Sequence, residues 1–154
     1  RAVRDSVSGE TSEIVGLQVD GLELEVKGNI NNKMSLIFGY SSLDGKTSKG
    51  GKPREIPDHT FSLFATYEVS DKFGWALGIT QQGESNIGND KPGLVLPEYT
   101  RVDLGAYYQI ADDLSVQMNL ENLTDELYFP HSHSTHQTSV GELLNVRLSI
   151  RMTF

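Results

Sequence analysis

Three histidines lie close together in one polar stretch near the carboxyl end of the chain. His131, His133 and His136 occur in the run His-Ser-His-Ser-Thr-His, at positions i, i+2 and i+5. Imidazoles at this spacing could converge on a transition metal or a haem iron. The stretch contains no cysteine and no carboxylate at ligand spacing, and a solvated loop is the alternative. We therefore expect no metal site and no resident cofactor.

A second polar stretch contains basic residues that could attract an anion. They are Lys46, Lys49, Lys52 and Arg54. Positive charges in an exposed loop can draw in an anionic ligand or the phosphates of lipopolysaccharide, and solvated charges without a ligand are the alternative. Aromatic contacts to a ligand could come from Tyr99, Tyr107 and Tyr128.

Other kinds of chemistry have little support in the sequence. No serine, histidine and aspartate fall together at paired strand ends, so we expect that the chain is not an enzyme. The absence of cysteine from the sequence excludes a thiol nucleophile, a disulfide framework and a cysteine metal site. The net charge of −8 argues against nucleic acid, whose phosphates require a basic surface.

The elements that must position these residues are strands with a period of two. The segment 144–154 is the clearest, because its apolar residues alternate strictly with polar ones. The apolar set is Leu144, Val146, Leu148, Ile150, Met152 and Phe154. The polar face carries Arg147 and Arg151, and we expect these and Arg101 to pair with Glu121, with Asp103 or with residues of a plug domain outside this sequence. About eleven residues is also the length that a tilted strand needs to cross the hydrocarbon layer of a membrane.

Six earlier stretches alternate in the same way, so we expect an all-β fold, an antiparallel up-and-down meander of about seven amphipathic strands. The expected strands are 14–30, 33–43, 59–70, 73–80, 98–110, 114–122 and 144–154, after a polar loop over residues 1–13. Short turns alternate with the long loops 44–57, 83–97 and 124–141, which places all the long loops at one end of the sheet. Outer-membrane barrels have this arrangement, with aromatic residues near the strand ends.

Three interpretations remain open on the residues alone. The chain can be a piece of a larger membrane barrel, which its first residue, Arg1, also favours. An open seven-stranded sheet would leave unpaired N–H and C=O groups in hydrocarbon and needs partner strands. A small self-contained membrane barrel with a structural or adhesive role would need an even strand number, and so an eighth strand within residues 1–13. A soluble β-barrel or sandwich that binds a small ligand would enclose its apolar faces in a core.

Six segments, in order along the chain, resemble one known family. The segments are 21–25, 38–44, 56–63, 96–103, 119–128 and 141–154. Among them, the run from Asn119 to Tyr128 resembles the family's Asn-x-x-Asn-Leu-Phe/Thr-Asp-x-x-Tyr block, and the run from Gly141 to Phe154 resembles its terminal strand. Over about residues 16–154 the chain thus resembles the TonB-dependent outer-membrane receptors, and within them the ferric-siderophore receptors.

The resemblance implies that residues 14–154 are the C-terminal third of a 22-stranded barrel with a plugged lumen. It places this barrel in the bacterial outer membrane, in contact with the membrane lipid. It implies active import of a ferric siderophore, energised by TonB with ExbB and ExbD through a plug domain that this sequence does not contain. Contacts to that anionic chelate would come from the loops, through Lys46, Lys49, Lys52, Arg54, Tyr99, Tyr128, His131, His133 and His136. Leu148, Ile150, Met152 and Phe154 would form the membrane-insertion signal for the barrel assembly machinery.

Overall fold

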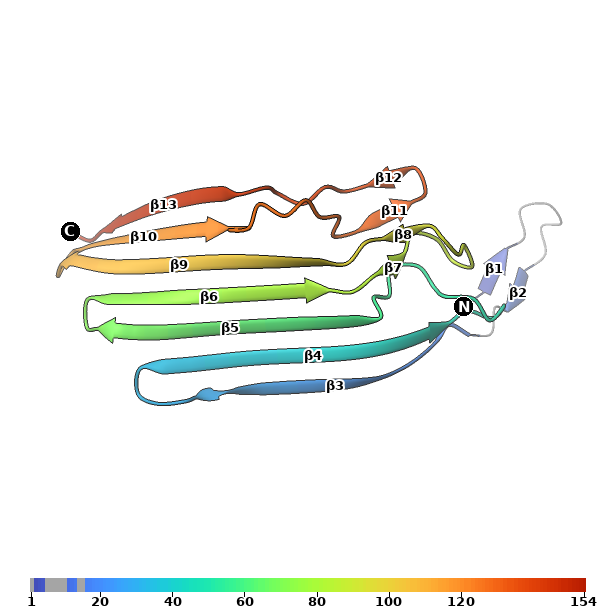
Figure 1. The fold of residues 1–154 in the computed structure, drawn as a ribbon, viewed down its shortest axis with the longest axis horizontal. Coiled ribbons are helices and arrows are strands. Elements are labelled where there is room, and N and C mark those ends of the chain that lie inside the picture. The colour runs from blue at the N-terminus through green and yellow to red at the C-terminus, as the bar shows by residue number, and fades with distance from the viewer. Residues whose placement is uncertain (1, 5–10, 14–15) are drawn as a thin grey trace.

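The computed structural model describes residues 2–4, 11–13 and 16–154, and its elements there are strands. Seven of them form one antiparallel sheet in the order β13-β10-β9-β6-β5-β4-β3 (Figure 1). Their bounds are β3 Gln18–Asn29, β4 Met34–Lys46, β5 His59–Ser70, β6 Phe73–Gln82, β9 Tyr99–Ala111, β10 Leu114–Glu121 and β13 Asn145–Met152. This is the expected up-and-down meander. In the described part of the chain, no helix has the length and apolar character that crossing a membrane requires.

The two ends of the sheet differ in the length of their connections (Figure 1). At one end the chain reverses in short turns after β3, β5 and β9. The Lys33 N–H donates to Asn31 Oδ1 (2.8 Å) in the first turn, and the Phe73 N–H donates to Ser70 Oγ (3.2 Å) in the second. Asparagine and serine close tight turns through such bonds. The long loops 47–58, 83–98 and 122–144 all lie at the other end, which confirms the predicted alternation.

The register of the strands gathers the apolar residues on one face, because residues directly opposite in neighbouring strands share a face. One apolar row crosses the sheet through Val26, Phe38, Leu63, Ile79 and Val102, and another through Leu77, Leu104, Leu120 and Val146. A polar row on the opposite face contains Asn29, Ser35, Thr66, Ala76, Gly105, Asn119 and Arg147. The sheet is therefore amphipathic from edge to edge.

The apolar face is open rather than packed into a core. Leu148 is 64% exposed and Ile150 is 70% exposed, and Met152 and Phe154 are exposed with them. Among the described residues, the buried hydrophobic side chains are Ala65, Leu96, Tyr99 and Tyr128. A soluble sandwich would bury such a face, whereas the lipid-facing wall of a membrane barrel presents it outward.

Short two-stranded sheets occur in segments that were expected to be irregular. β1 (Ala2–Arg4) pairs with β2 (Thr11–Glu13), so the polar loop expected over residues 1–13 is wrong for these two strands. Three-residue strands are too short to show a period in sequence. They pair with each other and not with the large sheet, so they supply no eighth strand to it. The rest of that segment, and the expected strand start at 14–15, lie outside the described residues.

Two further pairs lie within the long loops. β7 (Ser85–Asn86) pairs with β8 (Val95–Leu96), and β11 (Ser132–Ser134) pairs with β12 (Gln137–Thr138). These pairs form short hairpins beyond the end of the sheet where the long loops lie (Figure 1).

Candidate functional site

Arg54 and Glu55 join the three long loops into one layer. Both residues lie in loop 47–58, where the Arg54 N–H donates to Asn89 Oδ1 (2.8 Å) in loop 83–98. The Glu55 carboxylate accepts a hydrogen bond from the buried Ser132 N–H (2.8 Å) in loop 122–144, and the Arg54 guanidinium donates to the His133 carbonyl. Glu55 adopts a left-handed backbone (φ 56°), which a residue other than glycine adopts only where its surroundings fix it.

Two of the predicted cationic residues, Lys46 at the end of β4 and Lys52 in loop 47–58, form ion pairs with nearby carboxylates. Lys46 Nζ lies 3.3 Å from Asp44 Oδ2, and Lys52 Nζ lies 2.8 Å from Asp58 Oδ1. The hydrogen bond to Asp58 raises the pKa of Lys52 above its ordinary value of 10.5. Both pairs are exposed, so their contribution to stability is small.

The other two predicted cationic residues, Lys49 and Arg54, line one cavity. Its volume is about 950 Å³, and loops 47–58 and 83–98 form most of its wall. Lys91 lines the same cavity and was not among the predicted residues. Arg54 also lies near Glu55, with 3.5 Å between Nε and Oε2.

The three histidines do not converge on one point. His131 Nε2 lies 2.9 Å from Ser139 Oγ, while the rings of His133 and His136 meet edge to face with their centroids 6.0 Å apart. Among the described residues, no group of three or more histidine, cysteine, aspartate or glutamate side chains could hold a metal ion. A ligand contact through these histidines stays a prediction.

Tyr99 and Tyr128 stack on each other below the loop layer. Their ring centroids lie 4.6 Å apart, and the side chains are only 9% and 5% exposed. Gly141 contacts the Tyr128 ring so closely that a Cβ there would lie 2.2 Å from its Cζ atom. In this structure both rings pack against protein, and their predicted contact with a ligand stays untested. Tyr107 lies elsewhere, over Gly74 on the polar face of the sheet.

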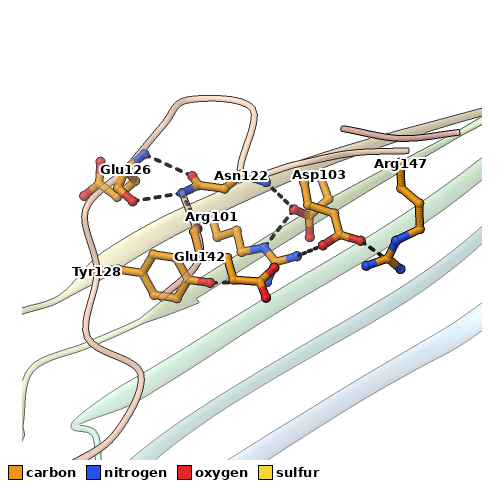
Figure 2. A network of polar contacts seen from close by, with 8 residues as sticks. Arg101, Asp103, Asn122, Glu126, Tyr128, Glu142 and Arg147 are labelled. Atoms are coloured by element: carbon orange, nitrogen blue, oxygen red, sulfur yellow. Dashed lines mark hydrogen bonds and ion pairs between the residues drawn. The ribbon is translucent and has the colours of Figure 1, made fainter. Parts of the chain in front are cut away.

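A network of charges ties this tyrosine pair to the polar face of the sheet (Figure 2). The Arg101 guanidinium contacts Asp103 at 2.8 Å, Glu121 at 3.8 Å and the Tyr128 hydroxyl at 3.3 Å. Arg147 on β13 reaches the same Glu121 at 3.6 Å. This confirms the predicted pairing of Arg101 and Arg147 with Asp103 and Glu121. Arg151, for which the same pairing was predicted, forms no ion pair with the residues that the structure describes.

Asn122 closes the exit from β10, and it explains the Asn-Leu-Thr-Asp-x-x-Tyr block. Its side-chain amide donates to the Glu126 carbonyl (2.9 Å) and the Glu142 carbonyl (3.0 Å), while its Oδ1 accepts from the Glu126 N–H (3.0 Å) (Figure 2). The Asn122 N–H donates to Asp103 Oδ1 (2.8 Å). The residue is 1% exposed and has a φ of 53°, a conformation that asparagine tolerates.

Asp125 holds the other end of the same loop. Its carboxylate accepts a hydrogen bond from the Leu144 N–H (2.9 Å), one residue before β13 begins. Asn122 and Asp125 together therefore tie the two ends of loop 122–144 to each other, and the Asn122 N–H ties the start of the loop to β9. The polar block of the sequence thus has a structural role in this chain.

The residues that sequence reasoning missed act through side chains whose partners lie in other loops or in the cavity lining. Glu55, Asn89 and Lys91 lie in turn-rich runs that indicate a loop without indicating its partners. Glu55 adopts positive φ, which its residue type did not indicate, whereas Asp90 is of a residue type that tolerates this conformation. The Asn-Asp-Lys-Pro-Gly run from Asn89 to Gly93 is the one signal that marked a tight reversal there.

The fold and the loop layer define the wall of an outer-membrane-type barrel, and the family comparison agrees. Residues 5–123 match the family model described as TonB dependent receptor-like, beta-barrel, and the chain belongs to this family.

Individual relatives are a little over a quarter identical to the chain across the aligned residues. It is 28% identical over 146 residues to the metal-pseudopaline receptor CntO of Pseudomonas aeruginosa, covering 87% of the chain and 20% of CntO. It is also 28% identical to the catecholate siderophore receptor Fiu of Escherichia coli K12, covering 99% of the chain and 22% of Fiu. The chain spans about a fifth of the length of these curated relatives.

Solved structures show the same arrangement of strands. The pyoverdine outer membrane receptor FpvA of Pseudomonas aeruginosa, bound to pyoverdine, superposes with a TM-score of 0.83 at 25% identity. The match covers the whole chain and 25% of FpvA. The seven-stranded sheet is thus similar to one sector of a complete receptor barrel.

Proposed function

We propose that the chain forms part of the barrel wall of a TonB-dependent receptor that imports a ferric siderophore across the bacterial outer membrane. The observation that carries this proposal is the amphipathic sheet: one face gathers apolar residues from all seven strands, with the most exposed of them on β3 and β13, and the other bears the network around Arg101. Lipid outside and a polar lumen inside would suit these two faces. The names of the relatives, which are receptors for metal-pseudopaline and for catecholate siderophores, support the class of cargo.

The open edges of the sheet support a place within a larger barrel. Among the strands that the structure describes, β3 and β13 each pair on one side only, and an unpaired backbone group in hydrocarbon costs several kcal/mol. Partner strands would satisfy these groups. A small self-contained barrel fits less well because the described N-terminal strands do not join the sheet, and a soluble barrel fits less well because the apolar face is exposed.

The proposal assigns roles to parts of the chain. The loop layer would contribute to the extracellular ligand surface, and the polar face would contact a plug domain that couples to TonB, ExbB and ExbD. β13 and Phe154 would be presented to the barrel assembly machinery during insertion. Absence of enzymatic activity stays a prediction.

Iron uptake by the complete receptor that contains this chain tests the proposal. Cells that lack other ferric-siderophore receptors would carry this receptor and be supplied with ⁵⁵Fe bound to catecholate, hydroxamate or hydroxycarboxylate chelators. We expect accumulation of ⁵⁵Fe from at least one chelate, and loss of that accumulation when tonB is deleted. A receptor that reaches the outer membrane but takes up no chelate, or takes it up equally without TonB, would contradict the proposal.

A further inference from the structure

We propose that Lys49 and Lys91 form an anion-binding subsite, which selects ferric chelates of net negative charge over neutral ones. This inference rests on the proposed function, because it names the class of chelate that the loop layer would accept. It arises from the charges that line the cavity between loops 47–58 and 83–98.

The cavity is cationic in an otherwise acidic chain. Lys49, Arg54 and Lys91 line it, and Asp90 is the carboxylate among the lining residues. The lining therefore carries a formal surplus of positive charge, whereas the whole sequence carries −8. A local positive field of this kind concentrates anions at the cavity.

Lys49 and Lys91 are the cations that remain available for a ligand. Neither ammonium group forms an ion pair within the part of the chain that the structure describes. Lys46 and Lys52 are paired with Asp44 and Asp58, and the Arg54 guanidinium is engaged by Glu55 and the His133 carbonyl. The four basic residues of the loop look alike in the sequence, but the structure separates them.

The backbone holds the two lysines in place. The turn that contains Lys49 is closed by a bond from the Gly50 N–H to the Thr47 carbonyl (2.9 Å) and one from the Thr47 N–H to the Gly51 carbonyl (2.9 Å). Thr47 Oγ1 donates to the Asp90 carboxylate, and the Asp90 N–H donates to the Lys52 carbonyl (3.1 Å), so the two loops are fixed to each other. The stem of Lys91 lies against Gly88, where an added Cβ would come within 3.2 Å of its Cδ.

The chemistry of ferric chelates makes charge a means of selection. Three dianionic catecholates outweigh the charge of Fe³⁺ and leave a trianionic complex, whereas three hydroxamates neutralise it. Two ammonium groups beside a cavity of this size attract the trianionic tris-catecholate complex and exert no net attraction on the neutral tris-hydroxamate complex. Ammonium groups act here as point charges, so charge rather than shape would dominate the preference.

The test measures chelate binding by the purified complete receptor. The probes are a ferric tris-catecholate and a neutral ferric tris-hydroxamate, and the variants are Lys49→Gln, Lys91→Gln and the double substitution. Each single change should raise the Kd of the tris-catecholate about fivefold, with the larger loss in the double variant, and should leave any tris-hydroxamate binding within about twofold. Salt should weaken tris-catecholate binding more in the parent receptor than in the double variant.

Two controls isolate the charge. Lys46→Gln also removes one positive charge, but Lys46 does not line the cavity. This control should change the Kd of the tris-catecholate and of the tris-hydroxamate by less than about twofold. Lys49→Arg combined with Lys91→Arg keeps the charges and should retain preference for the tris-catecholate.

The outcomes separate this inference from the proposed function. Binding and TonB-dependent uptake of a chelate with no effect of the two lysines would overturn the subsite and leave the import function intact. The subsite would also be overturned if the double variant loses co-purified lipopolysaccharide phosphate while its chelate affinities stay unchanged. A receptor that binds and takes up neither chelate would overturn both.

Discussion

Replacement of Asn122 should open the base of loop 122–144, where its side chain joins the two ends of the loop. Asn122→Ala removes three side-chain hydrogen bonds at a site that is 1% exposed, and at about 1 kcal/mol each these contribute about 3 kcal/mol. Alanine must also adopt the φ of 53° at a cost of about 1 kcal/mol, which brings the total to about 4 kcal/mol. Asn122→Gly removes the same bonds without the backbone cost and should lose about 3 kcal/mol.

Local hydrogen exchange measures this opening in the complete receptor, because the loop can open without unfolding the barrel. At 1.36 kcal/mol per factor of ten, amide exchange across residues 123–144 should accelerate about a thousandfold in Asn122→Ala and about 150-fold in Asn122→Gly. Asn31→Ala removes an exposed turn bond at the opposite end of the sheet and should leave this loop unchanged. Parent-like exchange in Asn122→Ala would refute the role given to Asn122, and equal acceleration in the two variants would refute the backbone contribution.

Three further predictions follow from the faces, the glycines and the loop charges. Leu24→Arg places a charge on the exposed apolar face and should cost about 2–4 kcal/mol of barrel stability at mid-membrane depth. Glu25→Arg places the same charge on the polar face and should be tolerated. The amount of folded receptor in outer-membrane fractions distinguishes the two variants. Gly141→Ala places a Cβ inside the Tyr128 ring and should destabilise the loop by about 2 kcal/mol, measured as faster amide exchange over residues 126–144. In Gly28→Ala the added Cβ meets no atom within 4 Å, so amide exchange over these residues should stay at the parent rate. Because the pKa of Lys52 is raised in the folded protein, the stabilisation from the Lys52–Asp58 pair is complete below pH 10.5 and is lost as pH rises through the folded-state pKa. A spin label at Ser48 should therefore gain mobility above pH 10.5 in the parent receptor but not in Lys52→Gln. The first prediction would be contradicted if Leu24→Arg were tolerated as well as Glu25→Arg. The second would be contradicted if amide exchange in Gly141→Ala matched the parent, and the third if the spin label had the same pH response in the parent and in Lys52→Gln.

The strands were predictable because alternation is a local property. β5 spans His59–Ser70, the predicted range, and the other six strands begin or end within a few residues of the predicted bounds. Where one face of a sheet is apolar, a shift of one residue would exchange the faces, so the sequence specifies the register as well. The pairs Arg101–Asp103 and Arg147–Glu121 followed from the same alternation.

The loop layer was not predictable, because its contacts join residues that are far apart in sequence. Glu55 contacts Ser132, and Thr47 contacts Asp90, through hydrogen bonds that no spacing rule relates. Tyr99 and Tyr128 were predicted as ligand contacts, and nothing in the sequence indicated that they stack in a buried pair closed by Gly141. The sequence placed His131, His133 and His136 in one run, but it did not show that His131 contacts Ser139 while the rings of His133 and His136 contact each other.

Spin-label accessibility along β13 tests the membrane wall most directly. Single labels at residues 145–152 of the complete receptor in lipid vesicles would be exposed to oxygen, which partitions into lipid, and to a water-soluble nickel chelate. Oxygen collisions should peak at Val146, Leu148, Ile150 and Met152, and nickel collisions should peak at Arg147, Ser149 and Arg151. Accessibility without this period of two, or with the two sets exchanged, would contradict the assignment of this sheet to the wall of an outer-membrane receptor.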